Sequence, residues 1–354
     1  MGLIEDTLAA ISPLDNEAEK AAAARLDSLT KPPGSLGRLE EVVRRYAAIR
    51  HDSSATIGRG AITVFAADHG VAEAGVSAYP KAVTLEMLRN IGAGGAAISV
   101  LARKLGYELI VTDVGVETDT SATPFAGVRY RRVGSGTSNF LHGPAMSLDQ
   151  SRRAVETGIE TAREAAGRGV TLIGIGEMGI ANSTPATAIL AAVTGIQPAR
   201  LAGRGTGVDD AGMSRKIEAV EAALKLHRSS CGDGLAMLAA IGGFEIAAMA
   251  GVCLGGAAAR VPVVVDGFIA TAAAAAAARL HPGLGSYLFF SHRSAEGGHA
   301  LALEALGARA LLDLDMRLGE GTGSALAMSV IESALALFHQ MATFASAGVS
   351  GKIE

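Results

Sequence analysis

The sequence predicts an α/β protein in which a parallel sheet is covered by helices on both faces. Short apolar runs alternate along the chain with longer helical stretches, and polar or Gly-rich turns follow the carboxyl ends of the apolar runs. Strands buried on both faces have this appearance, and the helices between them provide the crossovers that parallel strands need. Because ligands of such sheets bind at the carboxyl ends of the strands, we expect the functional residues in these turns.

Six apolar runs are the expected strands: residues 61–67, 109–114, 128–133, 170–173, 262–265 and 287–290. The run 128–133 is rich in arginine and is expected at an edge of the sheet. Helices are expected at 1–28, 39–49, 84–90, 92–105, 148–167, 186–193, 213–226, 233–240, 244–258, 271–280 and 324–344. The double proline Pro32-Pro33 prevents a continuous helix near the N-terminus, and we place a domain junction there.

The composition argues against several classes of protein. The chain has 354 residues, enough for one large α/β domain or two domains with a substantial core. Its formal net charge of −4 gives no electrostatic reason to expect nucleic acid or an anionic membrane as a partner. Cys231 and Cys253 are too few for a disulfide framework, and the N-terminal residues lack the pattern of a signal sequence. The Ala-rich run 270–280 is too short to span a bilayer, so we expect a soluble cytoplasmic protein.

The segment 174–187, GIGEMGIANSTPAT, is the centre of the candidate site. A strand-like run leads into it and an Ala-rich helix leads out. Pro185 suits the first helical position, with Thr184 or Ser183 as the N-cap. The free N–H groups of such a helix start suit a phosphate. Glu177 does not help to bind an anion, so it indicates that cation or N–H chemistry takes place beside the phosphate.

The same segment has a rival interpretation, because Gly174, Gly176 and Gly179 match the G-x-G-x-x-G pattern of dinucleotide-binding turns. Such a site also needs an acid about 20 residues further on. The residues in that window, AAVTGIQPARLAG, contain none. This argues against a nicotinamide-dependent enzyme and leaves a tight strand–helix turn as the structural alternative.

Four other residues each have a functional and a structural interpretation. Asp266 follows a strand and could hold a ribose hydroxyl or cap a helix. Glu320, between glycines, could reach a flat ligand or only favour the start of the following helix by about 0.3–1 kcal/mol. Lys216 could be a surface lysine or reach back to a substrate phosphate. His69 could be a general base or satisfy the backbone of a turn.

The loop 292–299 raises the question of a metal. His292, Glu296 and His299 could together form a cluster, but spacing means little in a Gly-rich loop and no second cluster supports it. We expect no metal, and we expect Ser294 with Gly297-Gly298 to donate to a phosphate.

Taken together, these residues resemble the nicotinate-nucleotide–dimethylbenzimidazole phosphoribosyltransferases, which make the lower ligand of cobalamin. The resemblance follows, in order, KPPGSLGRLE (31–40), ADHGV (67–71), SAYPKAVT (77–84), GAGGAAI (92–98), DVGV (113–116), GEMGIANSTPATA (176–188), GRGTGVDDAG (203–212), VDGFI (265–269), HRSAEGGH (292–299) and RLGEGTGSALAM (317–328). It implies a Rossmann-like sheet and a homodimer. It also implies a small helical domain built from both chain ends, 1–30 with 306–354, beside a large α/β domain, 31–305.

The resemblance further implies a reaction and its residues. Nicotinate mononucleotide and 5,6-dimethylbenzimidazole would give α-ribazole 5′-phosphate and nicotinate. The catalytic base falls on Glu320 and a second active-site acid on Glu177. The benzimidazole pocket falls on Ser77, Tyr79, Met87 and Leu318, with Glu86 standing where the family often carries Gln. The phosphate and ribose contacts fall on Gly176, Gly179, Asn182, Gly205, Lys216, Asp266 and Ser294. Ala181 stands where a glycine is frequent.

The chemistry of these substrates needs neither a metal nor a cofactor. The leaving nicotinate is a pyridinium and departs without an acid. The incoming benzimidazole must lose an N–H proton, for which a carboxylate such as Glu320 suffices. Attack opposite the departing base inverts the configuration, and Glu177 can stabilise positive charge on the ribose. The alternative is a non-catalytic sensor of nucleotides or cobamide precursors, but such a binder has no need of a base.

Overall fold

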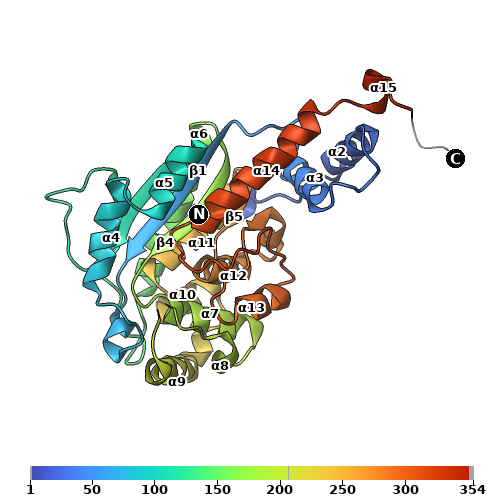
Figure 1. Ribbon diagram of the computed structural model, residues 1–354. Coiled ribbons are helices and arrows are strands. Elements are labelled where there is room, and N and C mark those ends of the chain that lie inside the picture. Colours follow the sequence, from blue (N-terminus) through green and yellow to red (C-terminus); the bar gives the residue numbers. More distant parts are fainter. Residues whose placement is uncertain (1, 206, 351–354) are drawn as a thin grey trace.

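The computed structural model describes residues 2–205 and 207–350 and contains a six-stranded sheet (Figure 1). The strands are β1 (Arg59–Ala67), β2 (Glu108–Gly115), β3 (Val128–Tyr130), β4 (Val170–Met178), β5 (Val263–Val265) and β6 (Leu288–Phe290). Their order is β3-β2-β1-β4-β5-β6, and each adjacent pair is parallel. This confirms the expected Rossmann-like sheet, with the arginine-rich β3 at an edge. The strand order reverses between β1 and β4, which is where ligands of such sheets bind.

One face of the sheet is covered by α11 (Phe244–Ala258), which packs on β1, β2, β4 and β5 and is itself covered by α6 (Leu148–Gly167). The residues of α11 from Phe244 to Ala257 are buried. The two helices approach closely because glycines face carbonyl groups across the contact: a Cβ on Gly158 would meet the carbonyl oxygen of Ala248, and one on Gly251 would meet that of Val155. The many small residues of the chain thus serve close helix packing. Other helices on this side are α1 (Leu3–Ala10), α10 (Gly234–Ile241) and α12 (Phe268–Leu280).

The opposite face carries α14 (Thr322–Gln340) over β1, β4 and β5, with α4 (Ala82–Gly92) and α5 (Ala97–Leu105) over β2 (Figure 1). Gly174 of β4 leaves room for α14, because a Cβ there would lie 3.0 Å from both Met328 and Ser324. By length and hydropathy α14 could cross a membrane, but 56% of that window is buried in the protein. It is the core helix that fixes one side of the candidate site.

The two chain ends meet beside the C-terminal half of α14. Both α2 (Asn16–Ser28) and α14 pack on α3 (Arg38–Arg50), and the Arg25 guanidinium donates to the backbone oxygen of Phe338 at 3.1 Å. These contacts support the expected helical domain, which stays a prediction; α1 lies instead against α6 and α11. A single helix over 1–28 is wrong, because Asp15 caps α2 by accepting from the N–H groups of Glu17 and Ala18.

The remaining helices connect and flank the elements described so far. They are the 3₁₀ helices η1 (Gly70–Ala74), η2 (Arg228–Ser230) and η3 (Pro282–Tyr287), and the α-helices α7 (Ser183–Thr194), α8 (Pro198–Leu201), α9 (Asp210–Leu226), α13 (His299–Ala305) and α15 (Phe344–Ala347). Of these, α7 and α9 pack against each other and carry site residues.

A pair of glycine substitutions in α6 tests the close packing of α6 on α11. We expect Gly158→Ala to lower the free energy of unfolding by about 1–3 kcal/mol, since the added Cβ would meet backbone atoms of α11 that cannot move independently. Gly167→Ala is the control: it lies in the same helix with nothing within 4 Å of its Cβ position, and should be neutral or stabilising by up to about 1 kcal/mol. Thermal unfolding measures both variants, and equal melting temperatures would contradict the packing argument.

Candidate active site

A cavity of about 410 Å³ opens at the carboxyl ends of β4, β5 and β6. Its lining comes from the segments 178–183, 266–270 and 292–296, which follow these strands, from 317–320 before α14, and from 76–87 around the start of α4. Glu177, the penultimate residue of β4, also lines it. The cavity lies where the sequence predicts the functional residues, in the turns after the apolar runs.

The predicted glycine-rich turn after residue 173 is wrong, because β4 continues to Met178. Gly176 therefore lies within the strand and is not part of the cavity lining. Its position does not support the predicted contact of Gly176 with the phosphate or ribose of the nucleotide. A Cβ on Gly176 would be 2.5 Å from the carbonyl carbon of Glu320. The glycine is needed for the close approach of the segment before α14, not for a dinucleotide.

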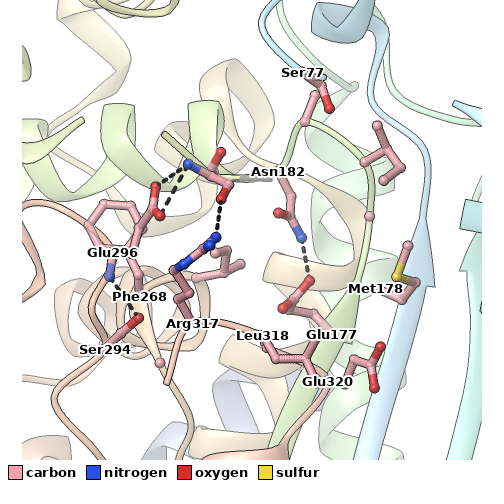
Figure 2. A pocket seen from close by; sticks show the side chains of 18 of the residues that line it. Ser77, Glu177, Met178, Asn182, Phe268, Ser294, Glu296, Arg317, Leu318 and Glu320 are labelled. Atoms are coloured by element: carbon pink, nitrogen blue, oxygen red, sulfur yellow. Dashed lines mark hydrogen bonds between the residues drawn. The ribbon is translucent and has the colours of Figure 1, made fainter. Parts of the chain in front are cut away.

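The helix after this strand also begins earlier than expected. Its N-cap is Asn182 and Ser183 is its first residue, so Pro185 occupies the third helical position. Asn182 does not cap α7 with its side chain; its amide donates instead to a Glu177 carboxylate oxygen (Figure 2). The amide thus fixes the orientation of the acid.

Glu177 is a buried carboxylate with a strongly perturbed proton affinity. It is 8% exposed. Burial raises its pKa from 4.5 to about 8, the Asn182 hydrogen bond opposes this, and the acids Glu245, Asp266 and Glu320 add to the rise. In the ligand-free protein at neutral pH the site thus favours the protonated acid.

Glu320 is the second acid of the cavity and has an unusual backbone. Its φ is 62°, in the left-handed region that non-glycine residues seldom adopt, between Gly319 and Gly321, whose φ angles are 86° and 85°. Burial raises its pKa, the N–H of Ile98 in the first turn of α5 opposes the rise, and Asp266 adds to it. Its Oε2 is buried without a hydrogen-bond partner among the described residues. A buried acceptor oxygen of this kind suits a proton transfer.

Asp266 holds the start of α14 in place. Its two oxygens accept from the N–H groups of Gly321 and Ser324, each at 3.0 Å. Burial raises its pKa to about 7, opposed by these backbone donors. Asp266 lines the cavity but does not cap the helix that follows it, because the N-cap of α12 is Gly267. It holds the start of α14 instead, and a ribose contact stays a prediction.

The cavity lining includes apolar side chains. Tyr79, Met87 and Leu318 are among them, and Ser77 also lines the cavity; that these residues bind a base stays a prediction. Tyr79 and Leu318 are 53% and 58% exposed, so the cavity is open to solvent beside them in the described chain. Glu86 is exposed on α4 and outside the lining, because it is turned about 100° from Met87 around the helix. Its predicted contact with the base is therefore not supported by its position.

The other end of the cavity is polar and contains a buried ammonium group. Lys216 on α9 is 1% exposed, and its Nζ donates to Ser183 Oγ at 3.0 Å and to the Gly203 carbonyl at 2.9 Å. It is not a surface lysine. Gly179, Asn182, Gly205 and Ser294 line the same cavity.

Several lining residues were not assigned to the site from the sequence: Ser183, Phe268, Glu296 and Arg317. The signal for Ser183 is its hydroxyl in the GIANSTPAT segment, which by itself predicts no more than an N-cap. Arg317 belongs to the RLGEGTG stretch and donates to the Gly205 carbonyl at 3.4 Å. Its place at the cavity follows from the fold of two distant loops, which no local pattern indicates.

The histidines near the cavity have structural partners. His299 Nδ1 accepts from the N–H of Ser294 at 2.8 Å, so its Nε2 carries the proton and donates to Thr271 Oγ1 at 2.9 Å. His69 lies outside the lining, paired with Glu245 at 2.7 Å. Within residues 2–205 and 207–350, His, Cys, Asp and Glu side chains form no group of three or more that could hold a metal ion.

The strained backbone at Ala181 can be tested directly. Its φ is 75°, so Ala181→Gly should raise the free energy of unfolding by about 1 kcal/mol through relief of the left-handed conformation. Ala24→Gly, at an exposed interior position of α2, should lower it by about 1 kcal/mol. Thermal unfolding of the two variants compares them, and a loss of stability in both would contradict the strain at Ala181.

The raised pKa of Glu177 predicts a pH-dependent stability. An unfolded chain releases this proton near pH 4.5 and the folded chain near pH 8, so the wild type loses up to about 1.4 kcal/mol per pH unit between these values as pH rises. Glu177→Gln removes this loss and keeps an acceptor for Asn182. Its melting temperature relative to wild type should therefore increase between about pH 5 and about pH 8. A difference that is constant over this range would show that the carboxyl pKa is not raised.

Comparisons with known proteins identify the family. A family model described as phosphoribosyltransferase matches residues 11–349. The nicotinate-nucleotide–dimethylbenzimidazole phosphoribosyltransferase of Chloroflexus aggregans is 51% identical over 354 residues, covering 100% of both chains. The protein of that name from Geobacter sp. (strain M21) is 47% identical over 99% of this chain and 100% of its own. A crystal structure of the Thermus thermophilus enzyme has a TM-score of 0.90 at 45% identity, covering 96% of this chain and 100% of that one. The chain therefore belongs to the nicotinate-nucleotide–dimethylbenzimidazole phosphoribosyltransferase family.

Proposed function

We propose that the protein transfers the 5-phosphoribosyl group of nicotinate mononucleotide to 5,6-dimethylbenzimidazole, giving α-ribazole 5′-phosphate and nicotinate. The observation that carries this proposal is that one cavity is lined by apolar side chains, by a pair of buried acids and by a polar cluster with a buried ammonium group. The three parts match a flat base, a reacting sugar carbon and a phosphate. The names of the relatives support the same reaction.

The polar end binds the phosphate of the nucleotide. Lys216 supplies a positive charge, and two of its three protons are already directed by Ser183 and Gly203. The Ser183 and Ser294 hydroxyls each accept a hydrogen bond, so each has its own proton to donate. Fixing the phosphate here holds the ribose in one orientation.

The apolar side holds the acceptor base. Tyr79, Met87 and Leu318 offer contacts for a flat, methylated ring, and Ser77 offers a hydroxyl beside it. The ring nitrogen that attacks then faces the sugar from the side opposite the nicotinate. Displacement from that side converts the β-linked nucleotide to the α-linked product.

Glu320 is the general base. The attacking benzimidazole forms a bond from one nitrogen to C1′ and loses the proton on its other nitrogen, and the electrons of the breaking bond return to the pyridine nitrogen. Burial raises the pKa of Glu320, which strengthens it as a proton acceptor. The left-handed backbone and flanking glycines place its carboxylate at the cavity without bulk from neighbouring side chains.

Glu177 stabilises the positive charge of the reacting sugar. Its carboxyl group lies in the same cavity and is oriented by Asn182. The pyridinium nitrogen of the nucleotide favours the ionised form of Glu177, because an opposite charge nearby lowers the pKa of an acid. The developing charge on the ribose then meets a carboxylate already in position.

We infer further that the protein is a cytoplasmic homodimer. The free cysteines Cys231 and Cys253 fit a reducing compartment. The exposure of Tyr79 and Leu318 at the cavity supports a second copy that covers apolar surface there. Light scattering on the purified protein tests the assembly: a mass of one chain would contradict the dimer.

The reaction can be tested with the purified protein, nicotinate mononucleotide and dimethylbenzimidazole, following nicotinate release by chromatography. We expect release that depends on the base, and a product with the α configuration by NMR. Binding of the nucleotide without release, with any azole, purine or phenol acceptor, would contradict the transferase and favour a sensor.

Glu320→Gln tests the base. The amide cannot take the benzimidazole proton, so we expect the turnover number to fall at least about 100-fold while nicotinate mononucleotide still binds. Steady-state kinetics and calorimetric titration measure the two effects separately. Glu304→Gln, exposed on α13, is the control with the same chemical change and should behave as wild type. A near wild-type rate for Glu320→Gln would assign the base elsewhere.

A further inference from the structure

Two loops meet at the polar end of the cavity, and Glu296 joins them. The N–H of Gly205 donates to both carboxylate oxygens of Glu296, at 2.8 and 3.1 Å (Figure 2). Gly203 lies directly against the same carboxylate: a Cβ there would be 2.5 Å from Glu296 Cδ. Glu296 is 7% exposed, so this contact is buried. The loop 203–205 is therefore bonded to the loop 294–299 through the side chain of Glu296, beside a backbone contact of Gly297 with Ala202 and Gly203.

Each loop also carries a group that faces the phosphate end. The Gly203 carbonyl accepts from Lys216 Nζ, which fixes the ammonium group between this loop and Ser183 at the start of α7. On the other loop, Ser294 Oγ accepts from the N–H of Glu296 at 3.2 Å. A shift of one loop against the other would move Lys216 away from Ser294.

The loop that carries Glu296 is itself anchored. His299 accepts from the N–H of Ser294 and donates to Thr271 on α12, and the N–H of Gly298 donates to the Leu201 carbonyl at 3.2 Å. Because the 294–299 loop is fixed on α12, Glu296 transmits that fixed position to the 203–205 loop.

We propose that Glu296 is a positioning residue for the nucleotide: its carboxylate clamps the 203–205 loop so that Lys216, Ser183 and Ser294 converge on the phosphate. This rests on the proposed function, in which these residues bind nicotinate mononucleotide. It also changes the role of Gly205, whose N–H is taken by Glu296 and serves as the anchor of the loop, not as a phosphate donor.

The charge of Glu296 has a second effect on the same lysine. Burial lowers the pKa of Lys216, and Glu296 opposes this lowering. Other charged groups lie on the elements around α9: Arg200 on α8, Arg204 and Asp209 in the preceding loop, and Arg317 at the cavity, whereas α7 carries none. On α9 itself the other charged residues are Asp210, Arg215, Glu218, Glu221 and Lys225. Glu296 is the acid that acts on Lys216 most directly, so it favours the charged ammonium that a phosphate requires.

Glu296→Ala and Glu296→Gln separate the clamp from the charge. The alanine removes the acceptor for the Gly205 N–H, and we expect the KM for nicotinate mononucleotide to rise about tenfold with kcat within about twofold of wild type. The glutamine keeps a carbonyl acceptor and should restore most of the affinity near neutral pH. Both variants remove the negative charge that favours the protonated form of Lys216. As pH rises into the alkaline range, their nucleotide affinity should therefore begin to fall at a lower pH than that of wild type. Calorimetry with inorganic phosphate should show the same order of affinities.

Gly203→Ala provides an independent test with Glu296 intact. Its added Cβ would displace the carboxylate, so the KM for the nucleotide should rise as in Glu296→Ala. Gly232→Ala is the control: it is exposed, with nothing within 4 Å of its Cβ position, and should have wild-type kinetics. If Glu296→Ala fails to fold, Gly203→Ala and the pH profile of Glu296→Gln still decide.

Three outcomes would overturn the proposal. One is nucleotide or phosphate binding by Glu296→Ala that equals or exceeds wild type, which would mean that the carboxylate competes with the phosphate. Another is a lower kcat with an unchanged KM. The third is a lower melting temperature of the Glu296 variants without any change in the KM for the nucleotide or in the alkaline pH at which nucleotide affinity falls. That result would show a merely structural role for Glu296. Failure of the wild type to release nicotinate would instead contradict the proposed function, so the two failures are distinguishable.

Discussion

The site depends on how the first turn of α14 is fixed against β4. Gly174 and Gly176 remove side chains from the strand where the helix approaches, and Asp266 accepts from two N–H groups at its start. Ser324 completes the contact by donating to the carbonyls of Ile175 and Val264 at 3.1 and 2.9 Å. The chain before the helix must then turn sharply, and the left-handed backbone at Glu320 is the consequence. Strain of this kind, about 1–3 kcal/mol per residue, persists only where the surrounding packing imposes it.

This arrangement gathers three acids whose pKa values burial raises. Glu177 is influenced by both of the others, Asp266 and Glu320, and within residues 2–205 and 207–350 none of the three pairs with a lysine or arginine. The protein gives them backbone and amide donors instead. In the proposed reaction the pyridinium nitrogen of the nucleotide supplies a positive charge beside them. When the glycosidic bond breaks, the nicotinate ring nitrogen becomes neutral, and the proton released by benzimidazole neutralises a carboxylate. In the proposed reaction the pyridinium charge is thus lost as one carboxylate takes up a proton, so the net charge beside the acids stays the same through the transfer.

The sequence predicted the parallel sheet and the edge position of β3, because apolar periodicity and turn composition are local signals. Part of the cavity lining was predicted through the resemblance of its motifs to a known family. The segment around Glu177 shows where local signals end. The glycines of β4 resemble a turn but serve a helix more than 140 residues away, a contact that no local pattern contains. The predicted contact of Glu86 with the base is unsupported for a different reason. The position of a residue in a motif does not give the direction of its side chain on a helix. Lys216 was ambiguous, since burial of a lysine depends on the loops that fold over it.

The apolar and polar ends of the cavity are linked by one more contact. The loop after β4 donates the N–H of Ile180 to Thr84 Oγ1 on α4 at 3.1 Å. The helix that carries Met87 is therefore fixed to the loop that carries Asn182, and the Asn182 amide in turn orients Glu177 at the end of β4. In a displacement with inversion, the attacking nitrogen, the sugar carbon and the leaving nitrogen must be in line. A shared loop between the two subsites maintains that alignment, because neither substrate's contacts can shift without the other's.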